Sequence, residues 1–124
     1  MAEKPRDLVR RTFLFAQNTR QLVNRLPRML SNYEDSRQLI RSSGSVAANY
    51  LEAQEGLSRR DFFYRIKICR KEARESGLWL RMISLEADAG LTAERDQLFA
   101  ESQELKRIFS AIAAKDDTEQ GAKG

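Results

Sequence analysis

The chain has 124 residues, of which 41% are hydrophobic and 32% charged, and its formal net charge is +4 at pH 7. It contains no histidine and one cysteine, which excludes histidine-based acid–base catalysis, Ser-His triads, His or Cys-rich metal sites and an internal disulfide. No apolar run approaches the roughly 20 residues that span a bilayer and no signal-peptide core is visible, so we expect a cytoplasmic protein without a membrane segment, a cofactor or enzymatic activity.

Helix-forming residues are abundant and only two prolines occur, which predicts an all-α fold. We expect residues 1–6 to be flexible and a first helix to begin at Leu8, with Asp7 as its cap. Pro27 disfavours helical geometry in the residue before it, so this helix should end near Leu26. Its core positions follow steps of four and three residues: Leu8, Thr12, Phe15, Thr19, Leu22 and Leu26, with Val9, Phe13, Ala16 and Val23 widening the apolar face.

Residues 28–35 are predicted to form a connection, with Met29, Leu30 and Tyr33 packed over the end of the bundle. The second helix should then begin near Asp35 or Ser36. Gly56 is its expected C-terminal stop, because glycine readily adopts the left-handed conformation that ends many helices. The predicted core positions of this helix are Leu39, Ser43, Val46, Tyr50 and Ala53.

The third helix is predicted to follow a cap at Ser58, with Asp61 completing a variant capping box. It should run about 28 residues and end at Gly90, after which Thr92 caps the fourth helix. The core positions of the third helix are expected at Phe62, Ile66, Cys69, Ala73, Ser76, Leu80, Ile83 and Ala87. Those of the fourth are expected at Leu98, Ser102, Leu105, Phe109 and Ile112.

Four amphipathic helices with short connections predict an antiparallel up-down-up-down four-helix bundle. We expect one domain over residues 1–124, with 116–124 flexible because the tail is polar and contains glycine. Cys69 falls on a core position, so it is interpreted as a small buried residue and not as a reactive thiol.

Basic residues are unevenly distributed along the chain. Residues 1–41 hold nine basic and four acidic side chains. In the third helix basic residues recur every seven positions, which places them in one stripe that could meet several phosphates. A solvated face balanced by Glu72 and Glu75 would explain the same stripe, and few aromatics are interleaved for base stacking. The candidate nucleic-acid-binding residues are Arg10, Arg11, Arg60, Lys67, Lys71, Arg74 and Arg81.

A run of small residues precedes Asn49 and Glu52, so the facing helix should approach closely there. Asn49 and Glu52 share one helical face, and Lys71 and Glu72 are adjacent on the next helix. We interpret these four residues as a structural polar network that fixes register. A catalytic or metal site is the less favoured alternative, because no third ligand type or nucleophile lies nearby in the sequence.

Several large apolar residues fall off the core positions, more than one bundle interior easily holds. A wide core face would explain Phe63 and Trp79. The remaining residues are candidates for an interface between subunits: Leu14, Ile68, Leu78 and Met82.

The segments SGSVAANYLEAQ, RRDFF and KEARESGLWLRMI, in this order, resemble the bacterial 23S rRNA intervening-sequence proteins. The similarity runs from about Leu8 to Ala114. Two departures are Tyr50 and Arg70, where smaller or aliphatic residues are usual. The residues that carry the resemblance are Ser45, Ala48, Asn49, Glu52, Ala53, Asp61, Phe62, Lys71, Glu72, Ala73, Glu75, Trp79 and Leu80.

The resemblance implies an up-down-up-down bundle that assembles into a ring-like homopentamer without enzymatic activity. Some members of the family are encoded inside insertions in large-subunit rRNA genes. A distant relative, the accessory variability protein of diversity-generating retroelements, serves a reverse transcriptase. The sequence thus favours an oligomeric, non-enzymatic bundle that binds structured nucleic acid, RNA or DNA, through phosphate contacts. The alternative is an oligomeric scaffold or accessory subunit for a protein partner such as a reverse transcriptase.

Overall fold

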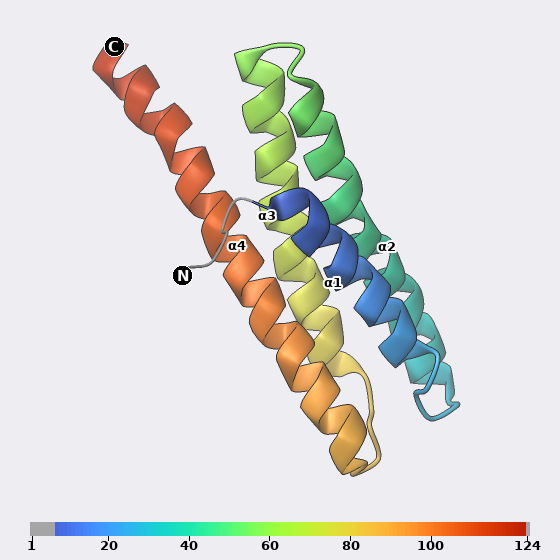
Figure 1. The fold of residues 1–124 in the computed structure, drawn as a ribbon. Helices are drawn as coiled ribbons and strands as arrows, with labels where there is room; N and C mark the ends of the chain where they lie inside the picture. The colour runs from blue at the N-terminus through green and yellow to red at the C-terminus, as the bar shows by residue number, and fades with distance from the viewer. Residues whose placement is uncertain (1–6, 124) are drawn as a thin grey trace.

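The computed structural model describes the backbone of residues 7–123 and the side chains of residues 7–116. This part of the chain contains four helices and no strand: α1 (Leu8–Val23), α2 (Leu30–Glu55), α3 (Arg59–Met82) and α4 (Ala89–Lys123). The helices alternate in direction (Figure 1), and each packs on its neighbours in chain order, with α4 closing against α1. Among the described residues no helix packs across a diagonal. The predicted antiparallel up-down-up-down four-helix bundle is confirmed.

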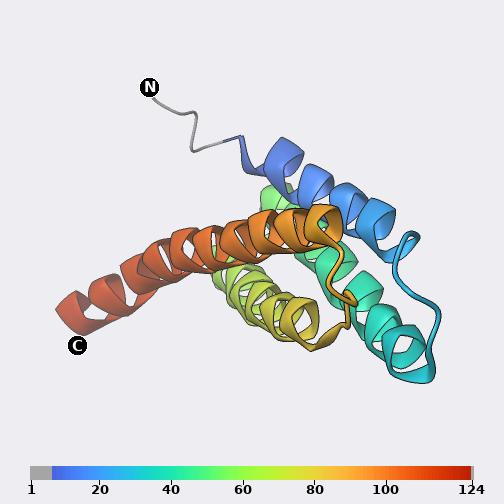
Figure 2. The ribbon, with the colours of Figure 1, turned by 90° about the horizontal axis from the view of Figure 1, so that it is seen from below.

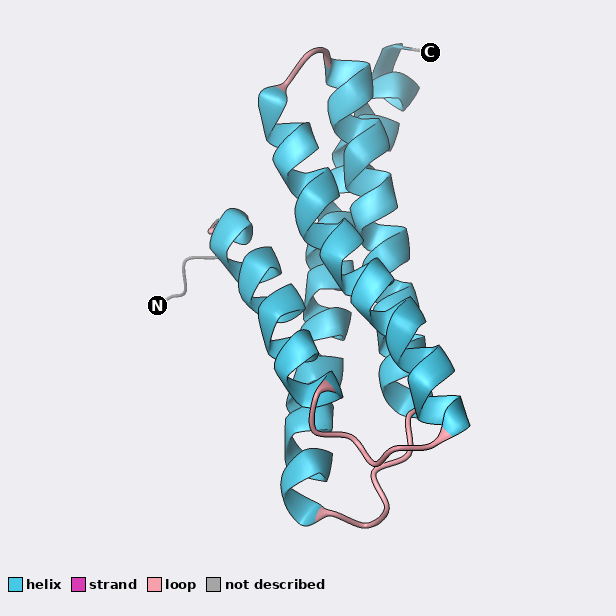
Figure 3. Ribbon diagram, turned by 90° about the vertical axis from the view of Figure 1, so that its right-hand side faces the viewer, coloured by secondary structure: helices cyan, strands magenta, loops and turns pink. Residues whose placement is uncertain are grey.

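The four helices are unequal in length. α1 has 16 residues against 26 in α2 and 24 in α3, so it covers only part of the α2–α3 hairpin (Figures 1 and 3). α4 has 35 residues and extends past α1 toward its C-terminal end, as the view from below shows (Figure 2). The contact between α1 and α4 is the least extensive of the four packed pairs. The surfaces of α4 therefore differ along its length, with α1 beside only one part of it.

The core is built from the positions that the four-and-three spacing predicts. In α1, α2 and α4 nearly all of these positions are buried, and Leu26 and Ile112 are half-buried. In α3 the predicted positions from Ile66 to Ile83 are buried, and Phe62 is half-buried. Hydroxyl groups also lie in the interior, where Ser42 of α2 and Ser76 of α3 form a 2.8 Å hydrogen bond. Small side chains at these levels let the helices approach closely.

Three predicted helix ends are confirmed by their hydrogen bonds or backbone. The carboxylate of Asp7 accepts a hydrogen bond from the backbone N–H of Arg10, and the hydroxyl of Ser58 accepts one from Asp61. Gly56 has a φ of 60°, the left-handed conformation that glycine adopts at little cost. These local signals lie within a few residues of the helix end that they control.

The beginning of α2 was predicted wrongly. The helix begins at Leu30 and not near Asp35 or Ser36, and Leu30 and Tyr33 are exposed instead of covering the bundle end. Asn32 supplies the reason. Its side-chain amide donates to the carbonyls of Pro27 and Ser84, both at 2.9 Å, and its carbonyl oxygen accepts from the N–H of Ser84 at 2.7 Å. The buried Asn32 thus holds the α1–α2 and α3–α4 connections together across 52 residues of sequence.

The connection between α3 and α4 also differs from the prediction. α3 ends at Met82, and the chain turns through Glu86 and Ala87, which have φ values of 50° and 62°. Ala87 is therefore exposed in a turn instead of buried in α3, and Gly90 lies inside α4 instead of ending α3. Asp88, not Thr92, caps α4, because its carboxylate accepts from the N–H of Leu91 at 3.0 Å.

Val9 and Phe13 do not widen the core face of α1, as was predicted, but are exposed. The adjacent residues Leu8 and Thr12 point into the bundle, and one step along a helix turns a side chain by about 100°. Residues 116–124 were expected to be flexible, but the first of them, Asp116, is buried and ion-paired with α3. The α4 backbone continues to Lys123, while residues 1–6 and 124 lie outside the described part of the chain.

Candidate nucleic-acid interface

The basic face of α3 is positioned by the core residues next to it. Ile66, Cys69 and Ala73 are buried, which fixes the rotation of α3 about its axis. The intervening basic residues then lie on one side of the helix, at the i, i+3, i+4 and i+7 spacing of a single face. That side borders α4, where Leu105 and Phe109 face the core and Lys106 and Ser110 follow each of them by one residue.

Together the two helices form a concave site of about 340 Å³, which we call the α3–α4 groove. It is lined by Lys67, Arg70, Lys71, Arg74, Lys106 and Ser110. Five of these six side chains are cationic, and they come from residues up to 39 positions apart in the sequence. Among the side chains that the structure describes, none that lines the groove is acidic or aromatic.

The charges in the α3–α4 groove are largely uncompensated by the described side chains. Lys67 is the exception, since its ammonium lies 3.4 Å from a carboxylate oxygen of Asp116, which also approaches Arg59 at 3.7 Å. Among the described side chains no carboxylate comes within 4 Å of the cationic groups of the other four: Arg70, Lys71, Arg74 and Lys106. The groove can therefore attract anions without first breaking an ion pair at these positions.

The seven candidate nucleic-acid-binding residues lie in several environments. Lys67, Lys71 and Arg74 line the α3–α4 groove. Arg60 is exposed at the start of α3, and Arg81 lies near its end with its guanidinium 5.8 Å from the ring centre of Phe99. The remaining two belong to α1.

Arg10 and Arg11 of α1 differ in exposure and in hydrogen bonding. Arg10 is exposed, whereas Arg11 donates two hydrogen bonds to Glu101 of α4, at 3.0 Å from Nε and 2.7 Å from Nη2. This bidentate geometry is the strongest that arginine makes with a carboxylate, so Arg11 is committed to joining α1 and α4.

Sequence reasoning missed the contribution of α4 to the groove. Lys106 and Ser110 were not singled out, and Arg70 was not among the candidate nucleic-acid-binding residues. The seven-residue repeat within α3 was visible in the sequence, but the partner residues on α4 show no comparable repeat. Only the placement of α4 against α3 brings them to the same groove.

The predicted polar network does not form among its four residues, and no hydrogen bond joins any two of them in the described structure. Asn49 is half-buried and accepts a 3.0 Å hydrogen bond from Arg65 of α3, while Glu52 is exposed. Lys71 lies in the α3–α4 groove, but Glu72 is buried on the α2 side, 3.5 Å from Arg41. Adjacent residues on a helix point about 100° apart, so they could not join one site here.

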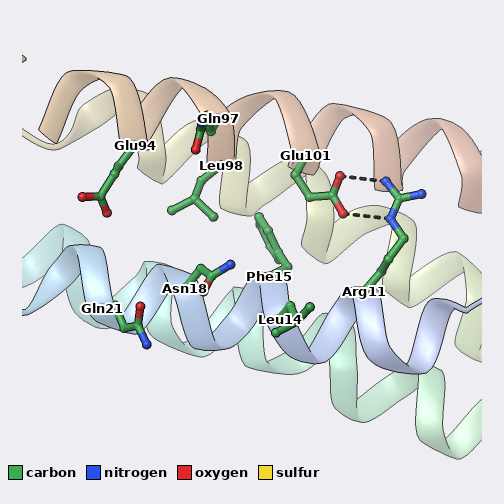
Figure 4. A pocket seen from close by; sticks show the side chains of 9 residues that line it. All are labelled: Arg11, Leu14, Phe15, Asn18, Gln21, Glu94, Gln97, Leu98 and Glu101. Atoms are coloured by element: carbon green, nitrogen blue, oxygen red, sulfur yellow. Dashed lines mark hydrogen bonds and ion pairs between the residues drawn. The ribbon is translucent and has the colours of Figure 1, made fainter. Parts of the chain in front are cut away.

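A second groove, of about 330 Å³, lies between α1 and α4 (Figure 4). Leu14, an interface candidate, lines it beside the buried Phe15, and the Arg11–Glu101 pair closes one end. Glu94, which also lines it, is hydrogen-bonded by Arg25, and this contact lowers the pKa of the Glu94 carboxyl and raises that of Arg25. The groove mixes apolar, amide and ion-paired side chains and presents no concentration of one charge.

The other interface candidates show graded exposure. Leu78 and Met82 are 50% and 57% exposed and lie one turn apart on α3. Leu14 and Ile68 are half-buried.

No group of three or more acidic or cysteine side chains that could hold a metal ion occurs in the described part of the chain, and none of its helices is long and apolar enough to cross a membrane.

Comparison with known proteins supports the resemblance seen in the sequence. The family described as 23S rRNA-intervening sequence protein matches residues 5–111. A crystal structure of a protein of unknown function from the S23 ribosomal protein family of Bacteroides thetaiotaomicron is similar, with 27% identity, 85% of this chain and 96% of that chain covered, and a TM-score of 0.69. No curated protein matches. The family match spans α1 to α3 and most of the described length of α4, so this chain belongs to the 23S rRNA-intervening sequence protein family.

Proposed function

We propose that this protein is a non-enzymatic, oligomeric helical bundle that binds structured RNA by its phosphate backbone. The observation that carries the proposal is the α3–α4 groove, where five cations converge and four of them have no carboxylate partner among the described residues. Cations that replace the counterions of a polynucleotide gain free energy from counterion release. The family name refers to sequences within 23S rRNA, which also favours RNA over DNA.

The chemistry of the groove suits phosphates better than bases. Ammonium and guanidinium groups donate hydrogen bonds but accept none, and no aromatic ring for base stacking is among the described residues that line the groove. Such a surface reads the position of phosphates and carries little sequence information. A folded RNA, in which phosphates of separate segments lie close together, fits this recognition better than an unstructured strand.

Oligomerisation would increase the strength of this binding. One chain carries a net charge of only +4, but each subunit of an oligomer would add its own groove. Several grooves binding the same RNA act as linked sites, whose combined affinity exceeds that of one site. The exposed apolar residues of the described chain supply candidate contact surfaces for an oligomer: Val9, Phe13, Leu30, Tyr33, Leu51, Leu57, Tyr64, Leu78 and Met82.

The proposal is tested by measuring the affinity for a structured RNA at several salt concentrations. We expect log K to fall linearly with log salt, with each phosphate contact contributing roughly 0.7–0.9 to the slope. The double variant Arg74→Ala, Lys106→Ala should bind more weakly at every salt concentration, with the slope reduced by roughly 1.4–1.8 for the two lost contacts.

The matched control is Arg28→Ala, Arg37→Ala, which removes two exposed arginines outside the α3–α4 groove. Its affinity should stay within about twofold of the wild type, because neither side chain lines the groove. A twofold change corresponds to only about 0.4 kcal/mol. Absence of binding at low salt, or equal losses in both variants, would exclude the groove as the RNA site. The alternative function, a scaffold for a protein partner, would then be favoured by the exposed apolar residues.

A further inference from the structure

The α3–α4 groove is concave and has the size of a small-ligand site. Its volume of about 340 Å³ falls at the lower end of the roughly 300–1,000 Å³ typical of ligand pockets. From Lys67 to Arg74 it extends about 10 Å along α3, at 1.5 Å per residue. A ligand held here would touch both helices at once, since Lys106 and Ser110 form the α4 wall.

The charge in this small volume exceeds what one phosphodiester can neutralise. Five cations line the groove, and the only described carboxylate in contact with any of them is Asp116, at Lys67. Arg70 and Lys106 are half-buried, so water screens their mutual repulsion less well than at an open surface. A phosphodiester carries one negative charge, whereas phosphates joined by anhydride bonds concentrate several charges in a comparable space.

The described lining offers no group suited to the rest of a nucleotide. Apart from the Ser110 hydroxyl, its described side chains are all cationic donors, and none is an aromatic ring for a base or a carboxylate or amide for a ribose or base edge. The hydroxyl and the cations can all donate to phosphate oxygens. The site therefore distinguishes phosphate groups from one another by charge and length, and it is indifferent to the base attached to them.

We propose that the α3–α4 groove is a binding site for a condensed phosphate, a chain of two or three phosphoryl groups joined by anhydride bonds. This chemistry has two sources, the 5′-triphosphate end of an RNA and free inorganic polyphosphate. The inference deepens the proposed function and rests on it for the first source only, because free polyphosphate could occupy the groove without RNA. At its edge Asp116 acts as an internal competitor for Lys67, and an incoming phosphate would replace its carboxylate there.

The first experiment measures binding of inorganic tripolyphosphate to the full chain by calorimetry. We expect binding by the wild type and at least about tenfold weaker binding by Arg74→Ala, Lys106→Ala, since the variant removes two of the five cations that would donate to the phosphate oxygens. Arg28→Ala, Arg37→Ala should bind within about twofold of the wild type. Helix content measured by circular dichroism verifies that both variants are folded. Undetectable binding, or binding that the groove variant retains, would overturn the inference.

The second experiment separates the two sources with one RNA prepared with a 5′-triphosphate or a 5′-hydroxyl. A preference of about tenfold or more for the triphosphate, lost in the groove variant, would assign the site to RNA ends. Equal affinity for both RNAs together with tripolyphosphate binding would assign it to free polyphosphate. Tripolyphosphate binding with no RNA binding would keep this inference and refute the proposed function. RNA binding without tripolyphosphate binding would refute this inference and keep the proposed function.

Discussion

Cys69 shows how the interior controls the chemistry of a single residue. It is fully buried, and its thiol donates a weak hydrogen bond to the Val46 carbonyl at 3.5 Å. Burial raises the pKa of the thiol from its ordinary value of 9.0 to about 12, because the interior disfavours the charged thiolate. The residue is therefore a packing element, as its core position in the sequence indicated.

We predict that Cys69 does not react with a thiol reagent in the native protein at pH 8 and reacts readily after denaturation. The thiolate is the reactive species, and both its pKa and its burial suppress it in the fold. The raised pKa also makes the free energy of unfolding depend on pH. The stabilising contribution is fully present below about pH 9 and is lost as the pH rises toward 12, because the unfolded chain releases the thiol proton before the folded one does. Absorbance from a chromogenic disulfide reagent measures the reaction, and a rapid native reaction would contradict the burial.

At the residue scale, Asn49 and Glu72 show which part of a polar site the sequence predicts. Their helical faces follow from spacing, and Asn49 does receive a hydrogen bond from α3, as expected. The donor is Arg65, however, and Glu72 is associated with Arg41 of α2. Partner identity depends on the axial shift and rotation of one helix against another, which a single sequence does not specify.

At the scale of helices, two glycines allow close approach in different ways. A Cβ at Gly77 of α3 would lie 3.0 Å from Oγ of Ser102 and 3.1 Å from Nε2 of Gln103, both on α4. At Gly44 of α2 it would meet only the end of the flexible Arg20 side chain, at 3.1 Å. Gly77 is buried and Gly44 half-buried. The same substitution should therefore have opposite effects at the two positions.

We predict that Gly77→Ala destabilises the protein and that Gly44→Ala stabilises it. Alanine in a helix interior is favoured over glycine by about 0.5–1 kcal/mol, which should appear at position 44 because Arg20 can move. At position 77 overpacking costs about 1–3 kcal/mol, which outweighs that gain. Urea unfolding measures both free energies. Stabilisation by Gly77→Ala would show that α4 moves away from α3 easily at this level.

Most helix ends that a local residue decides were predicted, although the Asp88 cap of α4 was missed, and the end that depends on a tertiary contact was predicted wrongly. Asp7, Gly56 and Ser58 act on their own helices, and these ends were found from the sequence. The start of α2 depends on Asn32, whose partners include Ser84 in the α3–α4 connection. A local sequence pattern does not predict a hydrogen bond between residues 52 positions apart.

For the whole molecule we predict an oligomer, with five subunits expected from the family resemblance alone. Leu78 and Met82 form an exposed apolar pair on α3, and burying each large side chain is worth about 1.5–3 kcal/mol. Leu78→Glu, Met82→Glu should give a folded species of lower mass in multi-angle light scattering. The control Gln17→Glu, Gln54→Glu adds the same two charges at exposed polar positions and should keep the wild-type mass. A wild-type mass of one chain would contradict the prediction.

The sequence by itself determined four helices, their order, their core faces and the family of the protein. These depend on periodicity and local signals, because a helix repeats every 3.6 residues and its buried face must be apolar. The tertiary structure alone decided that Lys106 and Ser110 join the basic residues of α3, that Arg11 is bound by Glu101 and that Asn32 links two connections. Each of these joins residues of different helices or connections, and such contacts depend on how whole helices rotate and slide until the core is filled.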